Sequence, residues 1–217
     1  MIYIEKYNDW YFPVNNFNTA VAVFNEWKEK GEYILSLVKN RRMCIQAGCN
    51  VGYFPEKLSH YFEEVHTWEP AENNIACIKK NSLPDNVKVH YAALGDEIGN
   101  VHISQTYEDN CGATQVAPEG DISLETIDQF NFDPGLIWLD IEGYEYRALL
   151  GAKNTIVKHK PIIVIENKGH MPEFGGGKFM PEGDDNFVAW MKTLNYKRIR
   201  RMMRDDIYVY DESLETS

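Results

Sequence analysis

Gly48 and Gly52 lie four residues apart in the segment QAGCNVGY, at the end of the apolar run MCIQAG. A glycine directly after a buried strand lets the chain turn tightly and lets a ligand approach the backbone. The segment lacks the Gly-Lys-Ser/Thr of a phosphate-binding P-loop, and its spacing is not the GxGxxG of dinucleotide-binding folds. A tight turn without a ligand is the simpler interpretation of these two glycines taken alone.

Glu69 ends the next apolar segment, at about 20 residues after Gly48, which is the spacing at which nucleotide-binding folds place an acid. A carboxylate there can accept hydrogen bonds from both the 2′- and the 3′-hydroxyl of a ribose. A surface glutamate that caps the following helix is the alternative, but the spacing to Gly48 favours ribose recognition.

Four further residues could carry acid–base chemistry. Asp140 and Glu142 follow the apolar run LIWL, and their alternation predicts that both carboxylates point to the same side. There they could accept a proton, bind a substrate hydroxyl or hold a cation; alternatively, Glu142 interacts with the dipole of the next helix. Glu166 ends the run PIIVIE and His170 follows it, and a histidine beside a glutamate suits a general base near neutral pH. We take Asp140, Glu142, Glu166 and His170 as the candidate catalytic residues, without ranking them.

Strands and helices alternate between these residues. After an extended segment at residues 1–14, the pattern predicts strands at residues 43–48, 65–69, 87–92, 136–140 and 162–166, helices at residues 19–39, 53–62, 73–81, 143–150 and 185–194, and an antiparallel strand pair at residues 196–201 and 206–210. Such alternation indicates an α/β fold, with a mostly parallel sheet covered by helices on both faces. Ligands of these sheets bind beyond the carboxyl ends of the strands, where the candidate residues fall.

The composition excludes several classes of protein. The 217 residues include 33 acidic and 22 basic ones, a net charge of −11, and an acidic chain is repelled by nucleic-acid phosphates. No apolar run approaches the ~20 residues needed to span a bilayer, and the N-terminus does not resemble a signal peptide, so we expect a cytoplasmic protein. The four cysteines form no CxxC pair, which predicts reduced thiols and no metal site.

Taken together, six segments of the chain resemble the FkbM family of class I S-adenosylmethionine-dependent methyltransferases. They are CIQAGCNVGYF, TWEPAENNIACIKKN, VKVHYAALGDEIGNV, LETIDQF, LIWLDIEGYEYRALLGA and PIIVIE. The resemblance spans residues 43–167, and its most specific part is Asp-x-Glu-Gly-x-Glu followed by Leu-x-Gly-Ala. That motif is matched by Asp140, Glu142, Gly143, Glu145, Leu150, Gly151 and Ala152. The resemblance implies a Rossmann-like class I methyltransferase fold with a mostly parallel seven-stranded sheet and a C-terminal antiparallel strand pair. We expect a single domain, in which residues 1–42 form an N-terminal extended segment and helix packed on the methyltransferase domain of residues 43–217.

The resemblance also implies S-adenosylmethionine as the cofactor and assigns roles around it. Gly48 and Gly52 would wrap the methionine part, Glu69 would hold the ribose hydroxyls, Ala92 and Ala93 would lie near the adenine, and Asp140 near the reactive methyl group. The full set of expected cofactor-binding residues is Gln46, Gly48, Asn50, Gly52, Tyr53, Glu69, Pro70, Ala92, Ala93 and Asp140. In one departure, Gln46 stands where the family has an acid that helps position the cofactor's amino end. An amide can hydrogen-bond there but lacks the charge attraction to an ammonium.

Four segments are expected to set the substrate or partners. Residues 104–122 and 168–184 are predicted loops beyond the strand ends, and the second contains three consecutive glycines flanked by Phe174 and Phe179, either as a lid or as an ordinary mobile loop. The basic run of residues 197–204 is either a charge-protected edge strand or an anchor for an acidic substrate such as a nucleotide-sugar. The helix of residues 19–39 is a candidate contact of a homodimer.

From these residues we expect an O-methyltransferase that acts on a hydroxyl of a sugar, a glycan or a secondary metabolite. The hydroxyl proton would be removed by one of the candidate bases, or its pKa would be lowered by a divalent ion held by two carboxylates. A nucleic-acid methyltransferase is the second hypothesis, disfavoured by the charge and by the lack of an Asn/Asp-Pro-Pro-Tyr/Phe tetrad. A non-catalytic binding module of the same fold is the third, favoured by Gln46. A nicotinamide oxidoreductase lacks its glycine pattern. The sequence leaves the acceptor, the base, metal dependence and the oligomeric state open.

Overall fold

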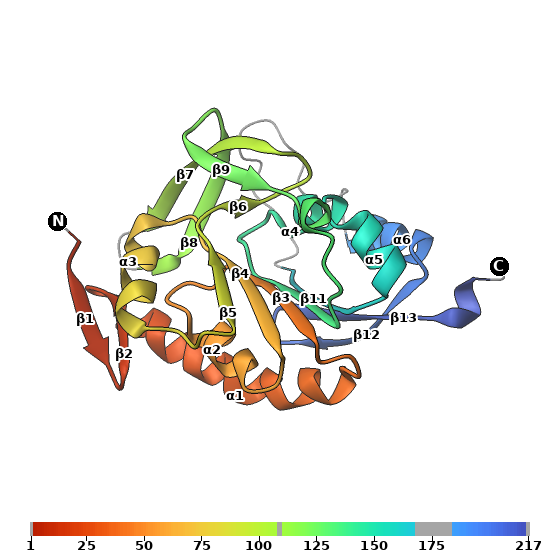
Figure 1. Cartoon of the computed structure of the whole chain (residues 1–217), viewed down its shortest axis with the longest axis horizontal. Coiled ribbons are helices and arrows are strands. Elements are labelled where there is room, and N and C mark those ends of the chain that lie inside the picture. The colour runs from red at the N-terminus through yellow and green to blue at the C-terminus, as the bar shows by residue number, and fades with distance from the viewer. Residues whose placement is uncertain (1, 108–109, 168–183, 216–217) are drawn as a thin grey trace.

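The computed structural model describes residues 2–107, 110–167 and 184–215, and a seven-stranded sheet forms its centre (Figure 1). The strands lie in the order β12-β13-β11-β10-β3-β4-β5. Their bounds are β3 Met43–Ala47, β4 Glu64–Trp68, β5 Val87–His90, β10 Leu136–Leu139, β11 Ile162–Glu166, β12 Tyr196–Met202 and β13 Asp205–Tyr210.

The sheet is parallel from β11 to β5, and β13 pairs antiparallel with both β11 and β12. The predicted mostly parallel, seven-stranded fold with a C-terminal antiparallel strand pair is therefore confirmed. The strand order reverses between β3 and β10, which pair in parallel with Ala47 opposite Leu139. In open α/β sheets this reversal is where ligands bind, because the connections leave the two strands toward opposite faces.

Helices cover both faces of the sheet. Their bounds are α1 Phe17–Leu37, α2 Tyr53–Ser59, α3 Glu72–Asn81, α4 Glu145–Leu150, α5 Lys153–His159 and α6 Asp184–Thr193, with short 3₁₀ turns at Ile127–Phe130 and Glu212–Leu214. Cys44, Trp138 and Val164 point to the face covered by α1 and α2, whereas Ile45 and Ile137 point to the face covered by α4, α5 and α6. This alternation is the two-residue period of a strand buried on both sides. None of the described helices is both long enough and apolar enough to cross a membrane.

A second, four-stranded sheet lies above the carboxyl ends of the main strands and corrects one prediction (Figure 1). It contains β6 Ala93–Leu94, β7 Gly99–Tyr107, β8 Asn110–Pro118 and β9 Ile122–Glu125. Residues 104–122, predicted as a loop, form most of the antiparallel β7–β8 hairpin and the start of β9. The prediction was wrong because the strands are stabilised by pairing and by packing of Val101 and Leu124 on Ala93, which local sequence does not encode. The other predicted loop, residues 168–184, lies outside the described residues except for Asp184.

The N-terminal segment forms a hairpin of β1 Ile4–Tyr7 and β2 Trp10–Pro13 that packs beside α3. The Tyr11 amide donates to Asn81 Oδ1 at 2.8 Å, and Asn81 Nδ2 donates back to the Tyr11 carbonyl at 3.1 Å. Buried Asn16 accepts a hydrogen bond from the Cys111 amide of β8 at 2.7 Å through its Oδ1. These contacts hold the hairpin and the start of α1 against α3 and β8. The organisation into an N-terminal part of residues 1–42 and a methyltransferase domain of residues 43–217 stays a prediction.

Candidate active site

Gly48 lies where β3 and β10 end side by side. Its φ is +77°, and a Cβ added to it would lie 1.7 Å from the carbonyl oxygen of Asp140. The Asp140 amide donates to the Ala47 carbonyl at 3.0 Å, and the Gly48 amide donates to the Trp68 carbonyl at 3.1 Å. Three strand ends are thereby tied together at one turn, which only glycine can make.

Gly52 and Tyr53, both predicted to bind the cofactor, lie at the start of α2. Gly52 takes a left-handed φ of +96° at the N-cap, where a Cβ would crowd the Leu83 side chain. The Tyr53 ring packs edge-on against Trp10 and Phe24. Neither residue lines the pocket described next.

A pocket of about 940 Å³, including its open mouth, lies at the carboxyl ends of the parallel strands. The sheet β6–β9 contributes Ala93, Cys111 and Val116 to its wall, and α1 contributes Glu26 and Lys30. The expected cofactor-binding residues that line it are Gln46, Gly48, Asn50, Glu69, Pro70, Ala92, Ala93 and Asp140.

The Glu69 carboxylate faces this pocket although its side chain is buried. Oε2 accepts the Asn50 amide at 2.8 Å, and Oε1 accepts the Ala71 amide at 3.0 Å. These bonds hold the carboxylate in one orientation and leave lone pairs on both oxygens for further donors. Burial raises the pKa of Glu69 to about 7.

Gln46 has a structural reason to be an amide. Its Oε1 accepts the Thr67 hydroxyl at 2.5 Å, and its Nε2 donates to the Ala47 carbonyl at 3.1 Å. A carboxylate at this position would face the Ala47 carbonyl with no proton to share. Gln46 therefore lines the pocket without a negative charge, and its carbonyl is already engaged with Thr67.

Asp140 and Glu142 both line the pocket, but not for the reason that their alternation suggested. β10 ends at Leu139, and Glu142 and Gly143 take left-handed φ values of +54° and +104°. The chain therefore curls after Asp140 rather than continuing as a strand, so the alternation argument was wrong.

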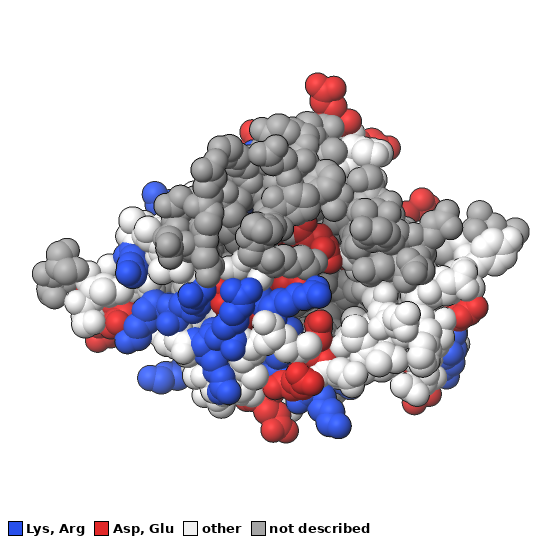
Figure 2. Space-filling model, turned by 180° about the vertical axis from the view of Figure 1, so that it is seen from behind, with Lys and Arg blue, Asp and Glu red and all other residues white. Residues whose placement is uncertain are grey.

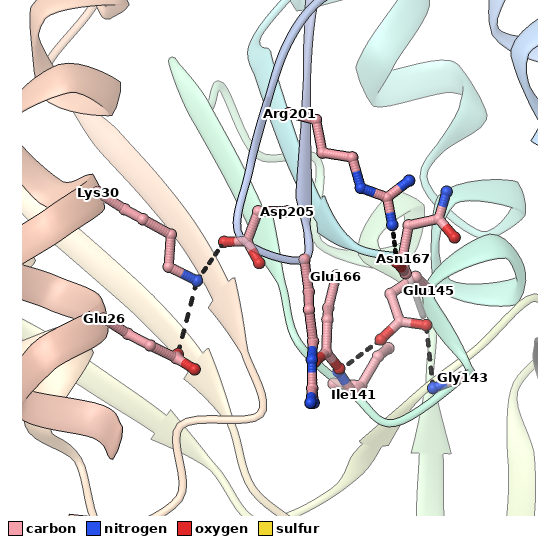
Figure 3. A network of polar contacts seen from close by, with 10 residues as sticks. Glu26, Lys30, Ile141, Gly143, Glu145, Glu166, Asn167, Arg201 and Asp205 are labelled. Carbon is pink, nitrogen blue, oxygen red and sulfur yellow. Dashed lines mark hydrogen bonds and ion pairs between the residues drawn. The ribbon is translucent and has the colours of Figure 1, made fainter. Parts of the chain in front are cut away.

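Glu145, which the sequence analysis placed only in a motif, holds this curl in place (Figure 3). Its Oε1 accepts the Ile141 amide at 2.8 Å and its Oε2 accepts the Gly143 amide at 3.0 Å. The side chain is fully buried. Burial, with a smaller contribution from the Asp140 charge, raises the pKa of Glu145 to about 8. The sequence did place Glu145 near the start of a predicted helix, directly after a turn. A carboxylate at such a place can accept hydrogen bonds from the backbone amides of the turn.

Asp140, Glu145 and Glu166 form a carboxylate cluster in which one oxygen of each lies within 4.8 Å of the others. Such a donor set is compatible with a hard divalent cation. Two of the three already have partners, because Glu145 accepts two backbone amides and Glu166 lies 3.8 Å from Arg204 Nη1. His170, the fourth candidate catalytic residue, lies outside the described residues.

Sequence reasoning missed a charged wall contributed by α1 and β13. Lys30 Nζ lies 2.8 Å from Asp205 Oδ2 and 3.5 Å from Glu26 Oε2, as Figure 3 shows. Lys30 and Asp205 are buried and stand 175 residues apart. Burial raises the pKa of both Glu26 and Asp205. The amphipathic pattern of α1 could not single out Lys30, because a lysine in a helix is usually exposed.

Asn74 is another polar pocket residue that the sequence analysis missed. Its Nδ2 donates to the Cys111 carbonyl at 2.9 Å, whereas its Oδ1 is buried without a hydrogen-bond partner among the described residues. Cys111 also donates through Sγ to Asn50 Oδ1 at 3.3 Å. β8 is thus joined to the pocket floor by polar contacts.

The basic run of residues 197–204 lies mostly on β12, at the edge of the sheet, and basic side chains gather on the face shown in Figure 2. Several are paired: Lys197 lies 2.8 Å from Asp211, and Arg198 lies 3.1 Å from buried Asp206. These pairs fit the charge-protected edge strand, while an anchor for an acidic substrate stays a prediction.

Comparison with known proteins gives consistent results. The family model described as the methyltransferase FkbM domain matches residues 46–205. A search of curated proteins finds no match. Among solved structures, the FkbM methyltransferase from Methylobacillus flagellatus KT is 18% identical with a TM-score of 0.50, over 79% of this chain and 44% of that one. Magnesium protoporphyrin IX methyltransferase from Synechocystis PCC 6803, solved with bound SAM, is 8% identical with a TM-score of 0.54, over 95% of this chain and 86% of that one. At these identities the likeness shows a shared fold, and the chain spans less than half the length of the Methylobacillus protein.

Replacing Gly48 by alanine should destabilise the protein and distort the pocket. The left-handed φ alone costs about 1–3 kcal/mol for a residue with a side chain, and the new Cβ would also push Asp140 away from β3. Urea unfolding measures the loss. Gly99→Ala is the matched control, because a Cβ there meets nothing within 4 Å, and equal stability of the two variants would contradict the proposed role of Gly48.

Glu145 should make stability depend on pH. Its pKa is raised from 4.5 to about 8, so the stability it contributes is fully present below about pH 4.5 and is lost as the pH rises through about 8. In Glu145→Gln this loss is absent, so the wild type should lose stability relative to the variant between about pH 5 and pH 9. Urea unfolding across this range tests it, with Glu32→Gln on the exposed face of α1 as control. If the difference in unfolding free energy between the wild type and Glu145→Gln does not change with pH, the raised pKa of Glu145 is refuted.

Proposed function

Because the chain belongs to the FkbM methyltransferase family, we propose that it is an enzyme that binds S-adenosylmethionine and methylates a hydroxyl group of a sugar, a glycan or a secondary metabolite. The observation that carries the proposal is the pocket at the strand reversal, in which Gly48, Glu69 and Asp140 lie along one wall. Since the chain spans less than half of a solved FkbM protein, the acceptor and any partner belong to the proposal as well.

The residues present fit the adenosine part of this cofactor. Glu69 is held by two backbone amides with lone pairs still directed to the pocket, as an acceptor for two ribose hydroxyls must be. The buried Oδ1 of Asn74 is a further acceptor in the same region. Ala92 and Ala93 are small and buried, which leaves room for a flat base above them.

The chemistry then requires alignment and a proton acceptor. S-adenosylmethionine supplies a methyl carbon that is already electrophilic, so this chain's part is to hold the acceptor hydroxyl in line with it. Asp140 is the strongest candidate to take the hydroxyl proton, because it lines the pocket and its carboxylate makes no hydrogen bond among the described residues. Glu145 is engaged in its loop and Glu166 lies beside Arg204, which leaves them less suited to the task.

Cofactor binding tests the first half of the proposal. Calorimetric titration with S-adenosylmethionine and S-adenosylhomocysteine should give micromolar dissociation constants. Glu69→Ala should weaken both by roughly 10- to 100-fold, about 1.4–2.8 kcal/mol, because it removes a charged acceptor. Glu72→Ala, exposed at the start of α3, is the control and should bind as the wild type does. No binding at millimolar cofactor would sink the proposal in favour of a non-catalytic binding module.

Methyl transfer tests the second half. Release of S-adenosylhomocysteine is followed with a panel of hydroxyl-bearing glycans and metabolites, and an accepted substrate is then used to compare variants. Asp140→Asn should lower kcat by about 10²–10⁴-fold with cofactor affinity within a few-fold, while exposed Asp121→Asn should change neither. A rate lost on chelation of divalent ions and restored by adding them back would point to metal activation through the carboxylate cluster instead. Methylation of RNA or DNA alone would establish the nucleic-acid alternative.

A further inference from the structure

The charged wall of α1 lies on the Asp140 side of the pocket, because Glu26 and Lys30 both interact electrostatically with Asp140. Glu26 and Lys30 are four residues apart, so both project from one face of the helix, and both line the pocket. Across the sheet, the strand ends run from β5 with Ala92, through Glu69 and Gly48, to Asp140 and then to β13 with Asp205. A ligand whose ribose lies at Glu69 therefore points its other end toward Asp140 and Glu26.

Negative charge exceeds positive charge at this end. Glu26, Asp140 and Asp205 interact electrostatically with one another and with Lys30, whose ammonium lies between Glu26 and Asp205 (Figure 3). A further cation, Arg204, lies 3.8 Å from Glu166 rather than against these three carboxylates. Three carboxylates around one ammonium leave an excess of negative charge, which a cationic group of a ligand would balance.

Glu26 is the member of this wall that is free to meet a ligand. Asp205 is buried and lies close to Lys30 at 2.8 Å, whereas the Glu26 carboxylate is 3.5 Å from the same ammonium and its side chain is 30% exposed, at the pocket. The neighbouring Gln46 cannot supply charge, because it is a neutral amide whose carbonyl already accepts the Thr67 hydroxyl.

We infer that Glu26, held in place by Lys30, is the carboxylate that receives the α-ammonium group at the amino-acid end of the cofactor. The inference rests on the proposed function and adds a residue from α1 to the site. A carboxylate–ammonium contact at a partly buried position is a charge-assisted hydrogen bond, which is about twice as strong as a neutral one. Lys30 is a positioning residue in this arrangement, since its ammonium lies 3.5 Å from Glu26 Oε2 and opposes the burial that raises the pKa of Glu26.

Three probes separate the parts of the cofactor. S-adenosylhomocysteine carries the ammonium, its des-amino analogue lacks only that group, and 5′-methylthioadenosine lacks the whole amino-acid end. Calorimetry measures the three affinities in the wild type, in Glu26→Gln and in Glu29→Gln, an exposed neighbour on α1 that serves as control. Because all probes bind the same folded protein, the ratio of affinities within one variant is independent of any loss of stability.

Glu26→Gln should weaken S-adenosylhomocysteine by on the order of 10- to 100-fold and leave 5′-methylthioadenosine within about twofold. The preference of the wild type for S-adenosylhomocysteine over its des-amino analogue should disappear in Glu26→Gln and persist in Glu29→Gln. If the wild type binds none of the probes, the proposed function fails. If it binds them and Glu26→Gln changes all three affinities equally or not at all, the function stands and this inference is overturned.

Discussion

The close approach of Gly48 to the backbone of Asp140 is the constraint on which the site depends. β3 and β10 are neighbours in parallel, yet the chain leaves β3 for the face of α2 and leaves β10 for the face of α4. The divergence opens a space above the strand ends, and its floor is the contact between these two turns. This contact also sets the positions of the neighbouring site residues. Asn50 follows the Gly48 turn directly and its amide donates to Glu69, and the curl at residues 141–144 begins directly after Asp140.

The main sheet and the pocket wall nearest to it could be predicted from the sequence. Apolar runs that end in Gly48, Glu69, Asp140 and Glu166 mark strand ends, and parallel strands gather such ends at one edge. The β7–β8 hairpin could not be recognised, because it is stabilised by packing of Val101 on Ala93 and Leu124, which lie outside the hairpin in β6 and β9. The place of Glu26 and Lys30 in the site could not be predicted either, since the periodicity of a helix does not indicate which edge of the sheet its polar residues will contact.

Local geometry also changed the interpretation of residues that the sequence did single out. Glu142 lines the pocket through a left-handed turn rather than through strand alternation. Gln46, which suggested a defective cofactor site, is explained by a buried hydrogen bond to Thr67 and by the neighbouring Ala47 carbonyl. In both cases the sequence analysis treated the side chain as if it had no local partners. Its direction and its hydrogen bonds are instead determined by the backbone conformation and by the adjacent strand.

The ion pair between Lys30 and Asp205 has a consequence for the order in which the protein acquires its site during synthesis. The two residues stand 175 positions apart, and Asp205 begins the last strand, which joins the sheet beside β11. Until that strand is made, the buried ammonium of Lys30 has Glu26 at 3.5 Å but lacks its closest partner, Asp205. A buried charge with incomplete pairing is unfavourable. During synthesis, the charged face of α1 therefore settles against the sheet only after β13 has been made, so the nucleoside half of the pocket forms before the charged half.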